Sequence, residues 1–298
     1  MPTVVKRTIH GKIYYYLEHS IRNSAGQITK KSKYLGSSIP KDLRKIETQF
    51  VYELNSERWF KIFDAIRVQY LNELKSLPRT AQEKALNEFS IRFTYDTQRI
   101  EGSTLTLRET AQLLDEGVSP GGKPLSDIRE AEAHQRVFLE MLRLKKDLTL
   151  QLVLDWHHQL FKETKPDIAG QIRKHRIRIS GSRFVPPSPV EIQPLLREFI
   201  SWYNSSKNGK IHPAALAALV HLKFVTIHPF IDGNGRIGRL MMNFVLNRNR
   251  YPMLNIEYEG RRTYYGALER SQVKNDENPF SQWFFRKYLR ENKRYTKD

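Results

Sequence analysis

The chain has 298 residues, of which 39% are hydrophobic, and it contains no cysteine. This length supports a sizeable core, and the absence of cysteine excludes disulfides, cysteine metal sites and thiol nucleophiles. The formal net charge of +18, from 50 basic and 32 acidic residues, favours attraction to polyanions. No apolar run is long enough for a membrane span or a secretory signal, so we expect a cytoplasmic protein without membrane contacts.

The first 40 residues predict a small basic β-hairpin. Residues 13 to 21 are rich in aromatic and β-branched side chains, and a turn at Asn23 to Gly26 leads to a second run that ends at Gly36. Residues 1 to 45 hold ten basic and two acidic side chains, a net charge of +8. Such a segment is either a solvated basic surface or a nucleic-acid interface.

The next segment predicts a series of helices. Apolar residues recur at helical spacing from Phe50 to Leu74, which indicates a long amphipathic helix. A capping-box pattern at Thr80 to Glu83 opens a second helix, at about residues 81 to 101, and Gly102 ends it. Another capping box, Thr106 to Glu109, begins the helix that follows.

The rest of the chain is predicted to be mainly α. Between Pro166 and Pro189 the helical period fails, residues 176 to 179 alternate, and Gly181 indicates a turn. This stretch predicts an exposed two-stranded flap, to whose edge an extended target segment could add as a strand. Helical patterns lie near residues 127 to 145, 148 to 163, 190 to 206, 214 to 226, 262 to 273 and 279 to 291.

A glycine-containing turn between two apolar helices carries the clearest chemical signal. One helix ends near Thr226 and another begins near Gly235, so the backbone amides of residues 233 to 236 can point outward together. Arg236 and Arg239 lie three residues apart on the first turn and add two cationic side chains on one side. The pattern predicts a binding site for a polyphosphate.

His228 and Asp232 lie immediately before this turn. An imidazole can take up a proton near neutral pH, and a carboxylate can bind a Mg²⁺ that phosphate oxygens also coordinate. Taken alone, His228 could cap a helix and Asp232 could belong to an ordinary turn; their combination with the anion site favours chemistry. The other histidines lack the spacing of a zinc site, so we assign them to packing.

From His228 to Arg239 the chain reads His-Pro-Phe-Ile-Asp-Gly-Asn-Gly-Arg-Ile-Gly-Arg, which resembles the complete signature of the Fic (filamentation induced by cAMP) domain family. Gly170 to Arg173, followed by Val185 to Pro187, resembles the target-docking flap of that family, and Tyr264 to Leu268 is similar to its adenine-side helix. The resemblance covers about residues 90 to 285. It implies a Fic-type helical bundle.

The resemblance also implies a reaction. His228 would remove the proton from a Ser, Thr or Tyr hydroxyl of a target protein, which attacks the α-phosphate of ATP and expels pyrophosphate. Asp232 would bind Mg²⁺. The chain is thus predicted to be a protein adenylyltransferase that uses ATP and Mg²⁺.

By the same resemblance, Asn234 and the amides of Gly233 and Gly235 would hold the α- and β-phosphates. Arg236 and Arg239 would hold the terminal phosphates. The kinase branch of the family, the Doc type, usually has Ala in place of Gly233 and Lys in place of Gly235, so both glycines favour AMP transfer over phosphate transfer.

Tyr265 would pack against adenine, again by resemblance. Some relatives have an asparagine seven residues after this tyrosine, where this chain has Gln272, so the details of adenine recognition stay open.

Thr97 to Gly102 resembles the inhibitory pattern of the family, in a position N-terminal to the core that is typical of its class II members. A carboxylate of Glu101 at a helix end could pair with Arg239 and occupy the place of the γ-phosphate. The alternative is that Glu101 only closes a helix with a surface ion pair. We predict autoinhibition, and Glu101 could also orient a water that removes AMP from modified targets.

The predicted organisation has three parts: a basic β-hairpin segment at residues 1–40, helices at 41–110 that include the inhibitory helix, and a catalytic core at 111–298. Two other functions stay open. One is a nucleic-acid-associated regulator with a nucleotide-sensing site, and the other is a transferase with another nucleotide or phosphocholine donor. Self-modification and a homodimer are compatible with the resemblance.

Overall fold

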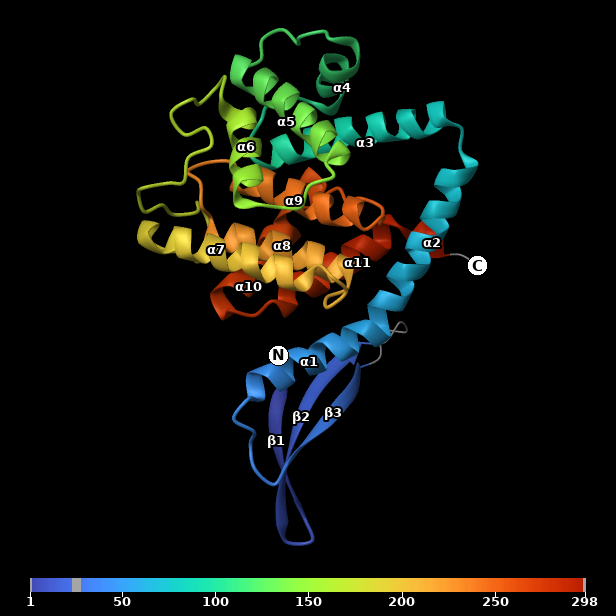
Figure 1. Cartoon of the computed structure of the whole chain (residues 1–298), viewed down its shortest axis with the longest axis vertical. Helices are drawn as coiled ribbons and strands as arrows, with labels where there is room; N and C mark the ends of the chain where they lie inside the picture. Colours follow the sequence, from blue (N-terminus) through green and yellow to red (C-terminus); the bar gives the residue numbers. More distant parts are fainter. Residues whose placement is uncertain (1, 23–27, 297–298) are drawn as a thin grey trace. The chain divides into compact units, whose positions relative to one another are not determined.

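The computed structural model describes residues 2–22 and 28–296 and divides into two compact units, Met1–Asp64 and Ala65–Asp298 (Figure 1). The turn predicted at Asn23 to Gly26 lies outside the described residues. The functional division at residues 40 and 110 stays a prediction. No helix in the described part of the chain has the length and apolar composition to cross a bilayer.

The first unit contains an antiparallel sheet of order β1-β2-β3, with strands Thr3–Ile9, Lys12–Arg22 and Ile28–Gly36. The predicted hairpin is found as β2 and β3, whereas β1 was not predicted. His10 and Gly11 join β1 to β2 with φ angles of 49° and 77°. Left-handed conformations at both positions match the right-handed twist of paired strands, which explains the tight turn.

Helix α1 (Leu43–Asn55) covers one face of this sheet. Leu17 of β2 is fully buried and packs with Phe50 and Leu54 of α1. A short π-helical segment, Ser56–Phe60, continues α1 into α2 (Lys61–Ser76), so the long amphipathic helix is confirmed with one irregular turn.

The second unit is a helical bundle centred on α8 and α9. Helix α8 is rich in alanine and leucine and is buried on almost every side, which suits a central helix. Helices α7 and α11 pack against α8, and α3, α5 and α6 pack against α9 (Figure 1). The mainly helical prediction is confirmed. The helices are α3 Arg79–Ile100, α4 Leu107–Glu116, α5 Leu125–Arg143, α6 Leu150–Phe161, α7 Pro189–Ser206, α8 Pro213–Ile227, α9 Asn234–Arg248, α10 Arg261–Lys274 and α11 Asn278–Glu291.

One of the two predicted capping boxes is correct. Thr106 accepts a hydrogen bond from the amide of Glu109, and the Glu109 carboxylate accepts one from the Thr106 amide, at the start of α4. The box predicted at Thr80 to Glu83 is wrong, because α3 begins at Arg79 behind Pro78 and has no side-chain cap. Proline is favourable at a helix start, since its missing N–H would have had no helical partner.

The two-stranded flap predicted between Pro166 and Pro189 is also wrong. This segment is fully described and contains turns and irregular backbone but no strand. Pro186 and Pro187 cannot donate the hydrogen bonds of a strand ladder. Instead, the guanidinium of Arg173 donates to the carbonyls of His175 and Pro187, and so joins the two sides of the loop.

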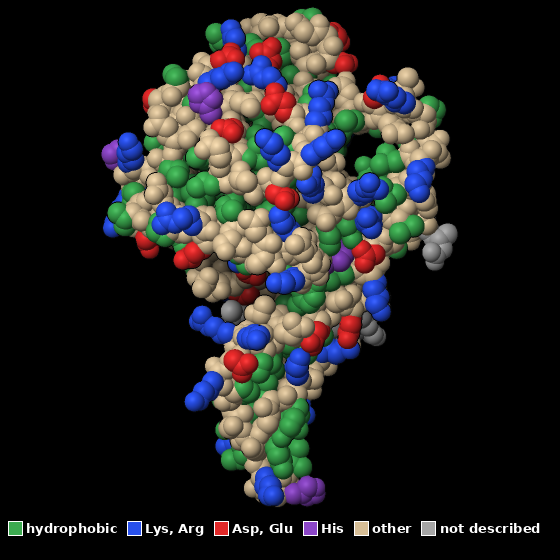
Figure 2. Space-filling model, in the orientation of Figure 1, with side chains coloured by type: hydrophobic (Ala, Val, Ile, Leu, Met, Phe, Trp, Pro, Cys, Tyr) green, Lys and Arg blue, Asp and Glu red, His purple; other side chains and the backbone are tan. Residues whose placement is uncertain are grey.

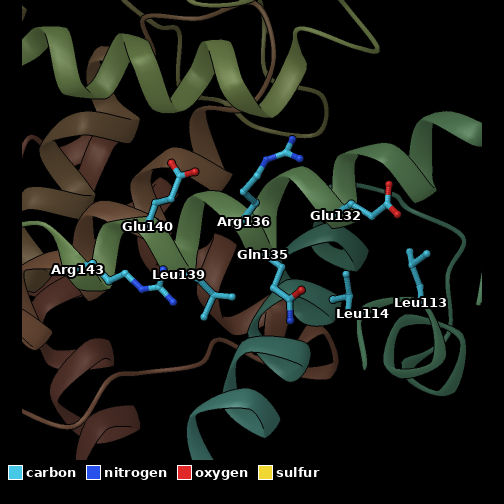
Figure 3. A pocket seen from close by; sticks show the side chains of 8 residues that line it. All are labelled: Leu113, Leu114, Glu132, Gln135, Arg136, Leu139, Glu140 and Arg143. Atoms are coloured by element: carbon cyan, nitrogen blue, oxygen red, sulfur yellow. The ribbon is translucent and has the colours of Figure 1, made fainter. Parts of the chain in front are cut away.

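A groove of about 420 Å³ lies between α4 and α5 (Figure 3). Two leucines come from α4 and the remaining lining side chains come from one side of α5, with two acidic and two basic residues among them. None of these residues belongs to the glycine-containing turn, so the groove is distinct from the predicted site. Its lining is Leu113, Leu114, Glu132, Gln135, Arg136, Leu139, Glu140 and Arg143.

Three histidines are buried inside the helical unit and are kept neutral there. His134 pairs through Nδ1 with Thr94, and His221 pairs through Nε2 with Tyr264, both at 2.8 to 2.9 Å. Burial lowers the pKa of His134 and of His221 to about 3, and that of His157 to about 4. Protonating any of them in the folded state is therefore unfavourable.

We expect acid to destabilise the helical unit through these histidines. Below the ordinary histidine pKa of about 6.5, the unfolded chain binds protons that the folded chain does not. Between pH 6 and pH 5 the free energy of unfolding should therefore fall by up to about 1.4 kcal/mol per pH unit for each buried histidine. Urea unfolding at several pH values across this range measures how steeply the free energy of unfolding falls with pH. His134→Gln should flatten it, whereas the same change at exposed His10 should not; an unchanged slope in His134→Gln would contradict the assignment.

Candidate active site

The predicted site is built on the loop that joins α8 to α9. Helix α8 ends at His228, which adopts a left-handed conformation with φ 52°. Gly233, with φ 81°, precedes the first residue of α9. A side chain on Gly233 would overlap the ring of Phe161, so a glycine is required there for space as well as conformation.

His228 is held in a defined orientation. Its Nδ1 lies 3.2 Å from the carbonyl of Val225, an acceptor, so we assign the ring proton to Nδ1. The lone pair of Nε2 is then available to take a proton. Burial lowers the pKa of His228 below the ordinary value, against the opposing effect of the Val225 carbonyl, and Arg173 lowers it further. The ring is consequently neutral at physiological pH.

Asn234 holds the loop in shape. Its side chain is 2% exposed, accepts a hydrogen bond from the amide of Phe230 at 2.9 Å and donates one to the carbonyl of the same residue at 2.8 Å. His157 supports the loop from the other side, with its ring stacked on that of Phe230 at 3.7 Å. The amide of Gly170 donates to His157 Nδ1, so Nε2 carries the proton and donates to the carbonyl of Asp232. The Asn234 side chain is thus used by the loop itself.

Arg239 is enclosed by α3. Its side chain is 1% exposed, and Nη2 lies 2.6 Å from Oε1 of Glu101, the residue that ends α3. The same guanidinium donates to the hydroxyl and to the carbonyl of Thr97, each at 3.1 Å. A methyl group on Gly235 would overlap the Glu101 carboxylate, which therefore lies against the first turn of α9. The predicted contact between Glu101 and Arg239 is confirmed.

Arg236 is 2% exposed and is paired with two carboxylates. Glu130 of α5 accepts from Nη1, and Asp232 accepts from Nη2 at 3.0 Å. Gln98 of α3 also accepts from Nη1, at 3.1 Å, and donates to the carbonyl of Glu130 at 2.7 Å. Arg236 is therefore fixed between α3 and α5.

Asp232 is ionised and partly open to solvent. Its side chain is 34% exposed, and Oδ2 lies 2.7 Å from Nζ of Lys165. Burial alone would raise the pKa of the Asp232 carboxyl, but Arg236 and Lys165 outweigh it and lower the pKa to about 2. A deprotonated, accessible carboxylate of this kind can bind a metal cation. No group of three or more His, Cys, Asp or Glu residues within the described chain is arranged to hold one on its own.

Tyr265 lies at the edge of the site. Its side chain is 45% exposed, and its hydroxyl donates to the carbonyl of Ile100 at 3.1 Å, next to Glu101. Gln272 donates to the carbonyl of Val225 at 3.4 Å, near the end of α8. Tyr265, the residue predicted to pack against adenine, thus contacts the end of α3.

Residues 147–246 match the sequence model of the Fic/DOC family. A protein of Drosophila ananassae named protein adenylyltransferase Fic is 31% identical to this chain over 287 residues, which are 94% of this chain and 55% of that protein. This chain belongs to the Fic/DOC family.

The same name is given to a Drosophila virilis protein that is 33% identical over 204 residues, covering 67% of this chain and 41% of that protein. The chain spans about half the length of the curated relatives it matches. A Fic domain containing signaling protein of Bacteroides thetaiotaomicron has a similar structure, with a TM-score of 0.71, 26% identity, and coverage of 79% of this chain and 95% of that one. A Fic protein of C. elegans has a TM-score of 0.68 and 27% identity, covering 85% of this chain and 74% of that one.

Sequence reasoning missed several residues that shape this Fic site. Glu130 and Lys165 lie on segments without any motif, and only their spatial position shows that they surround Asp232 and Arg236. Arg173 was noted within the flap, but not its contact with the carbonyl of His228 at 2.8 Å. In the sequence, Glu130 looks like an ordinary glutamate on the surface of a helix, and nothing near it indicates a functional role.

Replacing Asn234 tests how far the Fic loop depends on it. Asn234→Ala would leave the amide and the carbonyl of Phe230 buried without their partners, so the free energy of unfolding should fall by at least about 2 kcal/mol. Asn208→Ala, at an exposed position, is the matched control and should change it by less than about 0.5 kcal/mol. Denaturant titration of both variants gives the comparison. Equal stabilities would show that the loop keeps its shape without this side chain.

Proposed function

We propose that the chain is a protein adenylyltransferase that moves AMP from ATP to a Ser, Thr or Tyr hydroxyl of a target protein. The observation that carries the proposal is that one loop combines three groups: a neutral imidazole at His228, an ionised carboxylate at Asp232, and the amide-bearing N-terminus of α9. The relatives named protein adenylyltransferase support it over most of this chain.

In this reaction Nε2 of His228 accepts the hydroxyl proton, and the oxygen forms a bond to the α-phosphorus of ATP. The bond from that phosphorus to the bridging oxygen breaks, and pyrophosphate leaves. The backbone amides at the start of α9 and the side chains of Arg236 and Arg239 would stabilise the charge on the phosphates. Tyr265 would contact the adenine.

Magnesium fits the residues that are present. Asp232 is ionised and partly exposed, and its two cationic neighbours, Lys165 at 2.7 Å and Arg236 at 3.0 Å, show that it attracts positive charge. Asp232 would bind Mg²⁺ together with phosphate oxygens, and the ion would neutralise charge on the triphosphate. A single protein carboxylate is sufficient for a cation that arrives with its nucleotide.

We also propose that Glu101 inhibits this activity. Its carboxylate lies on the first turn of α9 and pairs with Arg239, so it occupies the place where the resemblance puts the terminal phosphate. An anion and a carboxylate cannot share one guanidinium at the mouth of the same helix without strong repulsion. ATP would therefore bind in a non-productive position, or Glu101 would have to turn away.

Glu101→Gly should increase AMP transfer at least several-fold, because Arg239 becomes available to the nucleotide. Incubation with Mg²⁺ and ATP labelled at the α-phosphate measures the label in the protein itself and in a lysate. His228→Ala, alone or combined with Glu101→Gly, should remove the label. Glu116→Gly, at the exposed end of α4, is the matched control for a glycine at a helix end.

Two results would contradict these proposals separately. Equal transfer by wild type and Glu101→Gly would refute the inhibition. Label in none of the variants would refute AMP transfer, and labelled UTP, GTP and CDP-choline would then test the other donors. Loss of label from a premodified target in the presence of wild type, and not of Glu101→Gly, would reveal the reverse activity.

A second candidate function, nucleic-acid binding, is favoured by the face of the β-sheet opposite α1. Leu17 points to α1, so the alternating residues Tyr14 and Tyr16 point to the opposite face. Tyr34 packs against both, with ring centroids 6.1 and 5.3 Å away, and the guanidinium of Arg7 covers Tyr16. In Figure 2 hydrophobic side chains run along this unit with Lys and Arg beside them.

By strand register Lys12 and Lys30 lie on the tyrosine face, and both are exposed without an ion pair to another described residue. Aromatic rings combined with unpaired cations are typical of surfaces that bind nucleic-acid phosphates and bases. We propose that this face binds nucleic acid. The catalytic unit would then be brought close to target proteins that are bound to the same nucleic acid.

Lys12→Glu combined with Lys30→Glu should weaken binding of a labelled random-sequence DNA by more than about tenfold. Fluorescence anisotropy of the labelled DNA measures this affinity. The affinity of the wild type should fall more than about tenfold between about 50 and about 200 mM KCl, because phosphate contacts are sensitive to salt. The control pair is Lys84→Glu with Lys274→Glu, both exposed on the helical unit. Binding that is lost equally in both pairs would indicate only general charge attraction.

A further inference from the structure

Four charged side chains form a closed cluster beside the active-site loop. Asp232 contacts Lys165 through Oδ2, at 2.7 Å, and Arg236 through Oδ1, at 3.0 Å. Glu130 contacts Lys165 through Oε1, at 3.0 Å, and Arg236 through Oε2. Each carboxylate therefore uses one oxygen for each cation, and the cluster has no net charge.

The two cations of this cluster are held very differently. Arg236 is 2% exposed, lies on the first turn of α9 and stacks 4.5 Å from the ring centroid of Phe161. Lys165 lies after the end of α6, and its Nζ is 5.0 Å from the centroid of the same ring, but its side chain is flexible and 39% exposed. Lys165 can consequently turn into solvent without repacking the core, whereas Arg236 cannot.

Two carboxylate oxygens, Asp232 Oδ2 and Glu130 Oε1, converge on the single Nζ atom of Lys165. Glu130 Oε1 also accepts from the hydroxyl of Thr164, at 3.0 Å, which fixes its direction. Hard divalent cations bind to carboxylate oxygens of this kind. We propose that Glu130 and Asp232 form one divalent-cation site, that the Lys165 ammonium holds it in the free protein, and that the metal ion displaces this ammonium.

This inference deepens the proposed function, because it rests on Asp232 as the metal-binding carboxylate. Once a divalent ion has replaced the ammonium, the two carboxylates, Arg236 and the ion together carry a net charge of +1, compared with zero for the four side chains in the free protein. The active-site loop then attracts a triphosphate more strongly than the free protein does. Lys165 would thus neutralise Glu130 and Asp232 in the absence of nucleotide. The same ammonium would lower the affinity of these carboxylates for the metal ion.

Binding of Mn²⁺ to the nucleotide-free 298-residue chain tests the inference without measuring AMP transfer. Lys165→Met removes the competing charge and keeps the length of the stem, so the affinity for Mn²⁺ in calorimetric titration should rise at least about fivefold. Lys162→Met, at an exposed position on the same segment, is the matched control and should leave it within about twofold. Circular dichroism and the melting temperature report whether each variant is folded.

Two further substitutions in the Lys165→Met background separate the contributions. Asp232→Asn should remove the Mn²⁺ binding, and Glu130→Gln should weaken it by at least about fivefold. If Asp232→Asn removes binding and Glu130→Gln has no effect, Glu130 is not part of the site and the inference is overturned, whereas the proposed role of Asp232 stands. An unchanged affinity of Lys165→Met for Mn²⁺ would overturn the inference that the Lys165 ammonium competes with the metal ion. Tight Mn²⁺ binding together with no AMP transfer would refute only the proposed function.

Discussion

The structure of the candidate active site depends on the burial of two guanidinium groups. Arg236 and Arg239 are at most 2% exposed, and a buried cation is costly unless a charge and hydrogen bonds compensate for the lost water. Each therefore has a carboxylate partner: Glu130 and Asp232 for Arg236, and Glu101 for Arg239. A polyphosphate that binds to these arginines would therefore have to compete with the carboxylates that already pair with them.

This requirement connects helices that are distant in sequence. Helix α3 supplies Thr97 and Glu101 to one arginine and Gln98 to the other, and α5 supplies Glu130. Asp96 anchors α3 further, by accepting from the amide of Tyr258 and from Asn255. Because α3 is fixed in this way, movement of the Glu101 side chain at its end is a smaller change than release of the whole helix.

The parts of the structure that local rules determine were predictable from the sequence. The amphipathic helices, the capping box at Thr106, the end of α3 just before Gly102 and the turn before α9 each depend on neighbours within a few residues. The contact between Glu101 and Arg239 was predictable only because both lie in motifs that resemble those of a known family. The loop after Pro166 was not predictable, since its alternating residues have no strand to pair with.

Glu130 and Lys165 were missed for a related reason. Their position near Asp232 results from the packing of α5 and α6 on α9, which no short sequence window contains. Strand β1 was missed because its few apolar residues lie among basic ones, and its pairing with β2 depends on a two-residue turn with an uncommon first residue, His10.

The conformation of His228 has a consequence for how this loop evolves. A left-handed backbone costs a residue with a Cβ atom about 1 kcal/mol or more relative to glycine, so the backbone conformation at the proposed catalytic base would by itself favour glycine. A natural variant with glycine at this position would recover that backbone cost while it loses the base. Selection for the chemistry has to oppose that gain continuously, and inactive descendants of such a domain would be expected to persist as well-folded proteins.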